Sequence, residues 1–485
     1  MSYFTEWAQQ YIAGKWKSGS GSWDIIDFNP FNGDKLAAIT IATAGEIDEA
    51  YRAAESAQRD WAATNPYARR AVLERALRLV EEREAEITEV IIAELGGTRL
   101  KAGFELHLAK EFLREAMHLS LRPEGRLVPA AADGKENRVY RTPVGVVSVI
   151  SPFNFPFLLS LKSVAPALAL GNAAVLKPHQ NTPIAGGVLV ARILEDAGLP
   201  PGVLNVVITD IAEVGDAFIE HPVPKVISFT GSDRVGRHVA TVGAAHFKRV
   251  ILELGGNSAL IVLEDADLDY AVDAAVFSRF VHQGQVCMAA NRVLVHRAVE
   301  REFTEKFTAR VRALKVGDPA DPETQIGPLI NRTQADSVTA LVERAVEAGA
   351  TALVHGTAEG TLVSPTVLTG VPEGSEALRQ EIFGPVVVLI PFDDEDEAVR
   401  IANDTPYGLS GAVHTADVER GVRVARRIET GMIHVNDSTV NDEPIVPFGG
   451  EKHSGLGRLN GEAMVEAFTT TRWVSIQYGR TRFPF

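Results

Sequence analysis

The chain has 485 residues, of which 46% are apolar and 23% charged, a balance typical of a globular protein with about three structural units. Its formal charge of −15 disfavours nucleic-acid binding, because a polyanion requires a basic surface. The single cysteine, Cys287, rules out an intramolecular disulfide and a cysteine-based zinc site, and it fits a reducing cytoplasm.

The amino-terminal part of the chain predicts long helices and no targeting segment. Residues 1–16 lack the basic start and apolar core of a signal peptide, and the longest apolar run, residues 164–176, is too short for a membrane span. Helical periodicity is strong over residues 46–61, 68–95 and 104–121, and the second pattern ends at two glycines. We therefore expect a protein without a membrane anchor.

The rest of the chain alternates between strand and helix patterns. After an extended segment at residues 137–151, short β-branched runs take turns with helical patterns from Ala173 onward, in two successive series. This order predicts βαβ units on parallel sheets, so the expected fold class is α/β, with a boundary at Gly255 and Gly256. Residues 469–485 have strand propensity but no neighbouring partner, and we expect them to pair with another domain or subunit.

Two stretches that follow predicted strands carry groups suited to a bound ligand. In SPFNFPF, Asn154 places an amide donor where it can face a developing oxyanion. In VLKP, Lys177 stands at the carboxyl end of a strand, where open α/β sheets bind ligands. A ribose or phosphate contact is one interpretation of this lysine, and a solvated lysine at a strand end is the other.

The stretch SFTGSDRVGR has the features of an anion site at the start of a helix. Backbone N–H groups near Gly231, together with the Ser232 hydroxyl, suit a phosphate, and the alternative is an ordinary strand-to-helix turn. The spacing to Gly236 imitates a P-loop. However, Arg237 and His238 replace the lysine and hydroxyl residue that magnesium–nucleotide hydrolysis requires.

A carboxylate and a thiol are the other candidates for chemistry. Glu253 ends an apolar strand ahead of two glycines, so it is either a general base or a glutamate that reaches solvent. Cys287 lies in a polar link after a helical pattern over residues 268–283, and it is either a buried apolar residue or a nucleophile. His282 lies five residues before Cys287, so the interpretation as a Cys–His hydrolase stays open.

Eight motifs in a fixed order resemble the aldehyde dehydrogenase superfamily. One of them contains Glu381 and Phe383 at a Gly-Pro turn that enters a strand. The motifs are SPFNFP, LKP, FTGS, LELGGN, GQVCMAANR, EIFGPV, IHVND and PFGGEKHSGLGR, and they span nearly the whole chain. The resemblance implies an α/β fold with a Rossmann-like cofactor domain, an α/β catalytic domain and a small β oligomerisation flap.

The resemblance also implies domain bounds and an assembly. Residues 1–124 and 145–255 correspond to the NAD(P)-binding domain, residues 256–451 to the catalytic domain, and residues 125–144 and 468–485 to the oligomerisation segment. A cytoplasmic homodimer or dimer of dimers follows from it, and such an assembly fits the unpaired terminal strand.

Matched residue by residue, the resemblance implies a mechanism of aldehyde oxidation. Cys287 matches the nucleophile that forms a thiohemiacetal and then a thioester. Asn154 and the Cys287 backbone N–H match the oxyanion hole, and Glu253 matches the base that activates water. A thiol suits this chemistry, because an aldehyde has no leaving group of its own and a thioester yields readily to water. No metal is required.

The resemblance implies NAD or NADP as the cofactor. Many members that prefer NAD have glutamate where this chain has Gln180, and a neutral amide removes the repulsion of a 2′-phosphate, so we expect NADP to be accepted as well. Leu459 stands where many members have a second glutamate, which leaves Glu253 as the base. The residues that match cofactor contacts are Ser151, Phe153, Lys177, Gln180, Gly231, Ser232, Gly236, Leu254, Glu381 and Phe383.

The substrate pocket is expected to be apolar. The stretches HQGQVCMAANR and VNDSTVNDEPIVPFGG and the tail RFPF most resemble the benzaldehyde and vanillin dehydrogenase branch. We therefore expect an aromatic aldehyde, with an aliphatic aldehyde or semialdehyde as the alternative. The expected lining residues are Phe155, Leu159, Val286, Met288, Ile445 and Phe448.

Three other interpretations compete with this one. A CoA-acylating aldehyde dehydrogenase would also use Cys287, but that branch usually lacks the base that Glu253 provides. A Cys–His hydrolase needs neither the FTGS motif nor Lys177. An inactive binding protein on the same fold would have no need of Cys287, Glu253 and Asn154 together.

Overall fold

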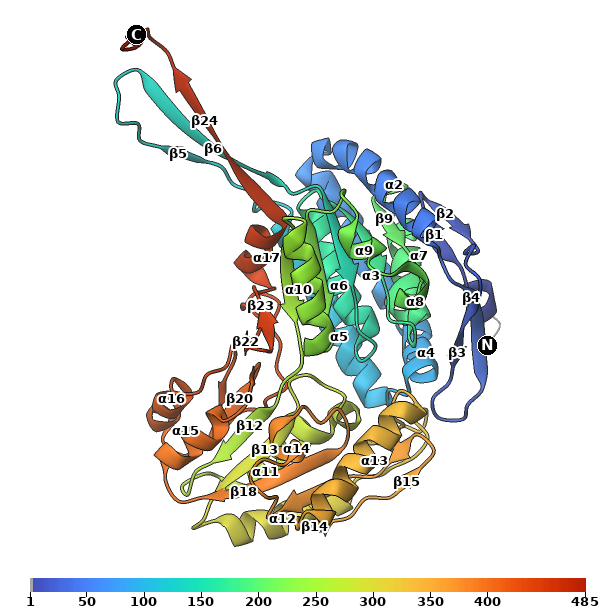
Figure 1. The fold of residues 1–485 in the computed structure, drawn as a ribbon, viewed down its shortest axis with the longest axis vertical. Coiled ribbons are helices and arrows are strands. Elements are labelled where there is room, and N and C mark those ends of the chain that lie inside the picture. Colours follow the sequence, from blue (N-terminus) through green and yellow to red (C-terminus); the bar gives the residue numbers. More distant parts are fainter. Residues whose placement is uncertain (1–2) are drawn as a thin grey trace.

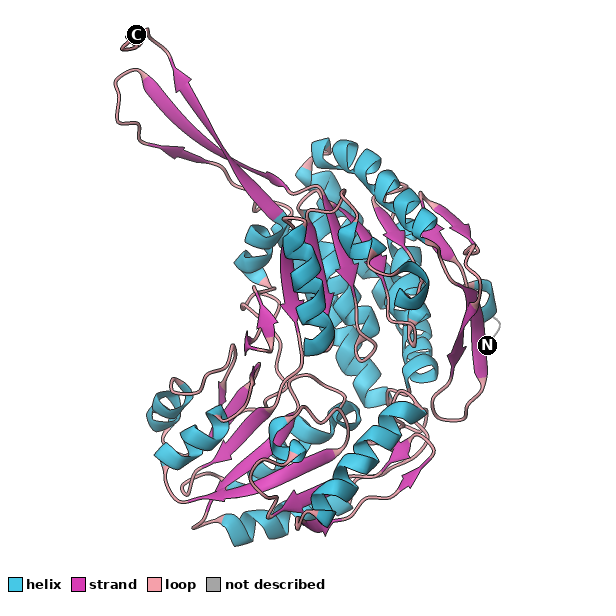
Figure 2. Ribbon diagram, viewed as in Figure 1, coloured by secondary structure: helices cyan, strands magenta, loops and turns pink. Residues whose placement is uncertain are grey.

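In the computed structural model, which describes residues 3–485, two α/β bodies lie one above the other and a long β ribbon projects from the upper one (Figure 1). Helices flank the sheet of each body (Figure 2). The predicted α/β class is therefore confirmed. Within the described part of the chain, no helix has both the length and the apolar character that crossing a membrane requires.

The upper body is built on an eight-stranded sheet. Its five central strands run parallel, as the alternating pattern predicted, and antiparallel strands are added at both edges. In spatial order the strands are β2 (Lys15–Lys17), β1 (Gln10–Ile12), β9 (Leu204–Val206), β8 (Ala173–Lys177), β7 (Val146–Ile150), β10 (Val226–Thr230), β11 (Arg249–Glu253) and β23 (Gly455–Leu456).

Both faces of this sheet are buried, because alternate strand residues enter different apolar clusters. Val146 and Val175 pack with Tyr51, while Val147 and Leu176 belong to the larger cluster on the other face. The helices that pack around this sheet are α2 (Ala44–Ala63), α3 (Pro66–Glu82), α4 (Glu84–Leu95), α5 (Arg99–Leu119), α6 (Pro156–Ala169), the π-helical turn η1 (Ile184–Val188), α7 (Leu189–Asp196), α9 (Ala217–Glu220) and α10 (Asp233–Ala245).

The single helical pattern predicted over residues 68–95 is two helices in the structure. The chain breaks at Arg83, whose φ of −103° and ψ of 18° leave the helical region. The Arg83 guanidinium pairs there with Glu86 at 2.6 Å and with Asp196 at 3.1 Å. The second helix ends where predicted, at Gly96, which adopts the left-handed conformation (φ 68°) that favours glycine.

The lower body has a seven-stranded sheet in which all pairs but one are parallel. Helices α11 (Leu268–Phe280) and α12 (Glu300–Arg312) cover one face, and α13 (Arg332–Glu347), α15 (Glu395–Asn403) and α16 (Val418–Ala425) cover the other. In spatial order the strands are β14 (Thr351–Val354), β17 (Thr366–Thr369), β18 (Val386–Phe392), β13 (Ala290–His296), β12 (Ser258–Val262), β20 (Gly411–His414) and β21 (His434–Val435).

The projecting ribbon contains the carboxyl-terminal strand whose partner the sequence left open. Strand β24 (Thr469–Gln477) pairs antiparallel along its whole length with β6 (Lys135–Pro143), and β6 also pairs with β5 (Arg126–Val128). The partner is therefore a distant segment of the same chain. The ribbon leaves large apolar side chains exposed, including those of Leu127 and Trp473.

The remaining elements are short. The hairpin of β3 (Asp24–Phe28) and β4 (Lys35–Thr40) lies beside the upper body. The others are α1 (Tyr3–Glu6), α8 (Ile211–Val214), the 3-10 turn η2 (Val281–Gly284), the β15 (Ala358–Glu359) and β16 (Leu362–Val363) pair, α14 (Glu376–Arg379), the β19 (Tyr407–Gly408) and β22 (Glu451–Lys452) pair, and α17 (Gly461–Phe468). The domain bounds given above stay a prediction.

Candidate active site

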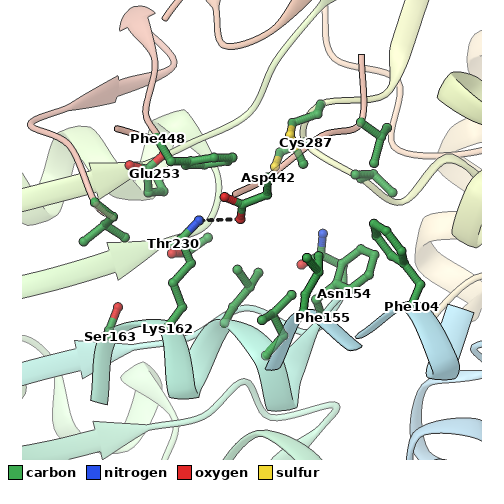
Figure 3. Close-up of a pocket in the computed structure, with 17 residues that line it drawn as sticks. Phe104, Asn154, Phe155, Lys162, Ser163, Thr230, Glu253, Cys287, Asp442 and Phe448 are labelled. Carbon is green, nitrogen blue, oxygen red and sulfur yellow. Dashed lines mark hydrogen bonds and ion pairs between the residues drawn. The ribbon is translucent and has the colours of Figure 1, made fainter. Parts of the chain in front are cut away.

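Cys287, Glu253 and Asn154 line one cavity (Figure 3). Glu253 is the last residue of β11, Asn154 lies between β7 and α6, and Cys287 follows the turn η2. Three residues that are far apart in the sequence thus face a common space. The fold therefore brings together the thiol, the carboxylate and the amide that the sequence singled out.

The loop that presents Cys287 is bent more sharply than its sequence suggested. The predicted helix over residues 268–283 ends at Phe280, and both His282 and Gln283 have positive φ angles, of 52° and 56°. This conformation is unfavourable for residues with a Cβ, and neighbouring groups hold it in place. One of them is the Gln283 side-chain amide, which donates to the carbonyl oxygen of Pro328 at 2.9 Å.

A glycine lets the Cys287 loop approach the sheet. A Cβ on Gly256 would clash with the carbonyl oxygen of Cys287, so only glycine permits this spacing without rearrangement. Arg279, fully buried at the end of the helix that leads into this loop, donates to the carbonyl oxygens of Ile382 and Gly384. The thiol is therefore carried on a segment that packs closely on Gly256 and follows an anchored helix end.

The thiol of Cys287 is protonated in the free protein. Burial is the main cause that raises its pKa to about 12, and the nearby carboxylates of Glu381 and Glu253 raise it further. Because the thiolate is the nucleophilic form, the site must supply a proton acceptor before this residue reacts.

Glu253 is such an acceptor. Its side chain is buried, and neither carboxylate oxygen has a hydrogen-bond partner among the residues that the structure describes. Burial raises the pKa of Glu253 to about 8, while Lys162 lowers it and Asp442 raises it. A carboxylate with a pKa close to neutral pH is suited to general base catalysis.

Asn154 presents one amide hydrogen to the cavity and uses the other to hold the Cys287 loop. Its Nδ2 donates to the carbonyl oxygen of Gln285 at 2.9 Å, and an amide nitrogen carries a second hydrogen. Glu105 of α5 anchors the adjoining helix, since its carboxylate accepts from the backbone N–H groups of Phe157 and Leu158 at 3.0 and 3.1 Å. The sequence pattern of α5 gave no sign of this buried carboxylate.

Five of the six residues predicted for the substrate pocket line the cavity, namely Phe155, Leu159, Val286, Met288 and Phe448. The prediction for Ile445 is wrong. Ile445 is not among the residues that line the cavity, and its side chain is 65% exposed on a turn closed by a hydrogen bond from the Val446 N–H to the Glu443 carbonyl. Other apolar lining residues, which the sequence had not indicated, are Phe104, Leu108, Leu158, Val440 and Leu459.

Two charged residues in the lining were also missed. Lys162 of α6 and Asp442 form an ion pair with an Nζ–Oδ2 distance of 2.6 Å, and their side chains are only 2% and 5% exposed. A signal was present in the sequence, because Lys162 is the only charged residue of a mainly apolar helix, PFLLSLKSVAPALA. Such an isolated lysine points to a specific partner.

A candidate cofactor surface begins at the end of β8. The Lys177 side chain is half-buried, desolvation lowers its pKa, and its ammonium group donates no hydrogen bond to any described residue. The backbone N–H of Ser151 donates to the Lys177 carbonyl at 3.1 Å, which places the two predicted contacts side by side. An ammonium group with free donors fits the hydroxyl groups of a ribose.

The start of α10 continues this surface. Ser232 is its N-cap, with the hydroxyl accepting from the Val235 N–H at 3.5 Å, and the Gly231 N–H donates to the Glu253 carbonyl at 3.0 Å. A Cβ on Gly236 would clash with Leu254, so glycine allows α10 to pack closely on the sheet. The helix N-terminus fits a phosphate group.

Aromatic and acidic groups from both bodies complete the surface. The rings of Phe153 and Phe383 meet edge to face with centroids 5.7 Å apart. Glu381 accepts from the Gly256 N–H at 3.1 Å, and burial raises its pKa to about 7. Gln180 is exposed just beyond Lys177. Together these donor sets fit a dinucleotide that extends from α10 to the cavity.

His282 is not placed to act as the base. It does not line the cavity, and neither ring nitrogen has a hydrogen-bond partner among the described residues. Its ring packs edge to face on Phe155 at 5.5 Å, and burial holds its pKa well below the usual value. The geometry therefore gives no support to a Cys–His hydrolase.

Comparison with known proteins agrees with the geometry. The sequence profile described as "Aldehyde dehydrogenase family" matches residues 16–474. A benzaldehyde dehydrogenase of Bacillus subtilis is 57% identical over the full length of both chains, and a vanillin dehydrogenase of Corynebacterium glutamicum is 47% identical over 96% of this chain and 97% of its own.

Solved structures agree as well. The crystal structure of an NAD-dependent benzaldehyde dehydrogenase from Corynebacterium glutamicum superposes with a TM-score of 0.90 at 44% identity, covering 97% of this chain and 98% of that one. The crystal structure of a salicylaldehyde dehydrogenase from Pseudomonas putida has a TM-score of 0.95 at 35% identity, covering 98% and 99%.

Proposed function

Since the chain belongs to the aldehyde dehydrogenase family and is an NAD(P)-dependent aldehyde oxidoreductase, we propose that Cys287, Asn154 and Glu253 oxidise an aromatic aldehyde to its carboxylic acid. The observation that carries the proposal is that these three residues line one cavity whose other walls are mainly apolar. An apolar cavity with a few convergent polar groups is the usual form of a small-molecule site.

The residues of the chain divide the reaction between them. Glu253 accepts the thiol proton of Cys287 and then loses it to water. The Cys287 sulfur bonds to the aldehyde carbon, and the free Asn154 amide hydrogen stabilises the oxyanion that forms. A bound nicotinamide cofactor supplies the hydride acceptor. Loss of hydride leaves a thioester on Cys287. Glu253 then takes a proton from water as the water oxygen attacks the thioester carbon, and passing this proton to the departing sulfur releases the acid and the thiol.

The cofactor is NAD or NADP. Relatives include enzymes described as NAD-dependent, and a structural neighbour from E. coli is described as NADP dependent. On this chain, Lys177 and Glu381 would bind ribose hydroxyls, the start of α10 at Gly231, Ser232 and Gly236 would bind the pyrophosphate, and Phe383 would pack beside the nicotinamide ribose. Ser151, Phe153, Gln180 and Leu254 would make the other contacts.

An aromatic substrate is supported by the names of the relatives and by the cavity. The benzaldehyde, vanillin and salicylaldehyde dehydrogenases named above all act on aldehydes attached to an aromatic ring, and they cover nearly the whole chain. The cavity offers Phe104, Phe155 and Phe448 as aromatic walls. Aromatic rings favour edge-to-face or offset contacts with such side chains.

The test of the proposal is a panel of aldehydes assayed with NAD and NADP in parallel. We expect kcat/KM for benzaldehyde to exceed that for an aliphatic aldehyde and for succinate semialdehyde, measured as reduced cofactor formed and carboxylic acid released. Ester cleavage without reduced cofactor would support the hydrolase instead. A strict requirement for CoA would support acyl transfer.

A single substitution tests the part that Gln180 plays in cofactor choice. Gln180→Glu is expected to lower kcat/KM with NADP by about tenfold or more relative to NAD, because a carboxylate repels the 2′-phosphate that a neutral amide tolerates. Gln180 is exposed, so the change leaves packing intact. Gln180→Met, which adds no charge, is the matched control and should keep the ratio within about twofold. An unchanged ratio in Gln180→Glu would show that a residue other than Gln180 lies at the 2′-phosphate of NADP.

The assembly and its location belong to the same proposal. The ribbon of β5, β6 and β24 would be an oligomerisation segment of a homodimer or dimer of dimers, since it projects from the body and exposes apolar side chains. A cytoplasmic location is supported by the single free cysteine. The two bodies would be the cofactor and catalytic domains.

A further inference from the structure

The buried ion pair of Lys101 and Glu105 on α5 takes no part in the reaction described above, although it lies next to the active site. Both side chains are completely buried, and the Lys101 ammonium donates to the Glu105 carboxylate. The same ammonium lies 4.4 Å from the centroid of the Phe155 ring, which is a wall of the cavity (Figure 3). The pair therefore packs against the start of α6.

Glu105 supplies the cap that the start of α6 lacks. The first N–H groups of a helix have no acceptor within the helix, and a Ser, Thr, Asp or Asn at the N-cap normally provides one. The N-cap of α6 is Phe155, which makes no such bond. Instead, one Glu105 oxygen accepts from the N–H groups of Phe157 and Leu158, at 3.0 and 3.1 Å. Position 155 is thus free to form the cavity wall.

Asn154 is tied closely to this cap. Only Phe155 and Pro156 separate it from the first capped N–H group, and the proline ring fixes its own φ. On its other side, the Asn154 amide donates to the carbonyl oxygen of Gln285, in the loop that carries Cys287, at 2.9 Å. A shift of the first turn of α6 would therefore move the amide relative to the thiol.

Helix capping alone does not require charges at this place. Taking an ion pair out of water has a cost that its attraction often fails to offset, and a polar N-cap side chain would serve the same N–H groups without a buried charge. A carboxylate bound at both oxygens, by α6 and by Lys101, is an acceptor that cannot turn away. We propose that Lys101 and Glu105 form a positioning pair that holds the Asn154 amide at the place of the oxyanion. This inference rests on the proposed function, in which Asn154 stabilises that oxyanion.

Two double variants separate the acceptor from the charges. Lys101→Met/Glu105→Leu removes both charges and leaves the first turn of α6 without its acceptor, whereas Lys101→Met/Glu105→Gln removes the charges and keeps an acceptor oxygen. We expect the leucine variant to slow the first turnover with benzaldehyde and cofactor, followed by rapid mixing, by about tenfold or more, because a misplaced oxyanion donor loses much of its effect. The glutamine variant should recover a large part of this loss.

Either of two results would overturn the proposal, namely an unchanged rate in the leucine variant or a glutamine variant that is equally slow. Glu105→Asp serves if the leucine variant does not fold, since it keeps the ion pair but withdraws the carboxylate from α6 by one methylene, and it should also slow the first turnover. Glu111→Leu/Arg114→Met is the matched control. It removes an exposed ion pair of the same helix and should keep the wild-type rate.

A double-mutant cycle with Asn154→Ala shows whether the pair acts through the oxyanion donor. In the Asn154→Ala background the amide is already missing, so Lys101→Met/Glu105→Leu should lower the rate further by about twofold or less. A general loss of structure would instead lower the rate by the same factor in both backgrounds, and that result would overturn the proposal.

Hydrogen exchange separates failure of this inference from failure of the proposed function, because it needs no turnover. Among the described residues, only Glu105 accepts from the N–H groups of Phe157 and Leu158. Mass spectrometry of peptides that cover them should show faster exchange in the leucine variant than in the wild type, and slower exchange again in the glutamine variant. Unchanged exchange in the leucine variant would reject the cap even if benzaldehyde is oxidised. A wild-type protein that oxidises no aldehyde would instead refute the proposed function, and the positioning role with it.

Discussion

Cys287→Ala is expected to abolish aldehyde oxidation, with a loss in kcat of about 10⁴-fold or more. Without the sulfur no covalent adduct forms on residue 287. A free aldehyde therefore cannot lose hydride to give a thioester. The residual rate should be that of water attacking a bound aldehyde. Reduced cofactor formed with benzaldehyde, followed by absorbance, is the measurement.

The same variant should still bind the cofactor, because Cys287 lies in the cavity and the predicted cofactor contacts lie along β8 and α10. Fluorescence titration with NAD checks this. Since Cys287 is the only cysteine, alkylation of the wild-type protein modifies a single thiol, and mass spectrometry of both proteins relates loss of the thiol to loss of activity. Turnover retained by the variant would refute the assignment of the nucleophile.

The parts of the site that could be predicted lie at the ends of strands. Asn154, Lys177 and Glu253 each follow or end a β-branched run, and parallel strands of one sheet bring their carboxyl ends to the same edge. Local pattern and topology together thus predict where these side chains gather. The alternation of β-branched runs with helical patterns likewise predicted the order of strands and helices in both bodies.

The parts that could not be predicted depend on tertiary packing. At the helix break, the Arg83 guanidinium pairs with Asp196, which is 113 residues away and which a local pattern does not report. The positive φ angles of His282 and Gln283 depend on contacts with a loop near Pro328. Periodicity describes a segment by itself and does not contain these contacts.

The pair of Lys162 and Asp442 lies between these two cases. A lysine within an apolar helix is visible in the sequence, but its partner is 280 residues away. Only the fold shows that both residues line the cavity of Cys287. The sequence thus indicates that a partner exists, and the structure identifies it and its place.

Glu253→Gln is expected to separate the two halves of the reaction. The amide cannot accept a proton, so the thiol proton of Cys287 must pass to water and the thioester forms more slowly, while hydrolysis of the thioester should slow further, by about 10²- to 10⁴-fold. Rapid mixing with benzaldehyde and cofactor should then show a burst of reduced cofactor close to one equivalent per Cys287, followed by a slow phase. An unchanged steady rate without a burst would assign the base elsewhere.

The pH dependence of thioester hydrolysis is an independent test of the role of Glu253. Because the pKa of Glu253 is raised to about 8, the ionised fraction that acts as a base grows as pH rises toward and through that value. Hydrolysis of the thioester should therefore accelerate with increasing pH in the wild-type protein, and this rise should be absent in Glu253→Gln.

Glu381→Gln is the matched control, since it replaces another carboxylate that has a raised pKa but does not line the cavity. It should raise KM for the cofactor and keep the pH rise, whereas loss of the rise in this variant would assign the titration to Glu381.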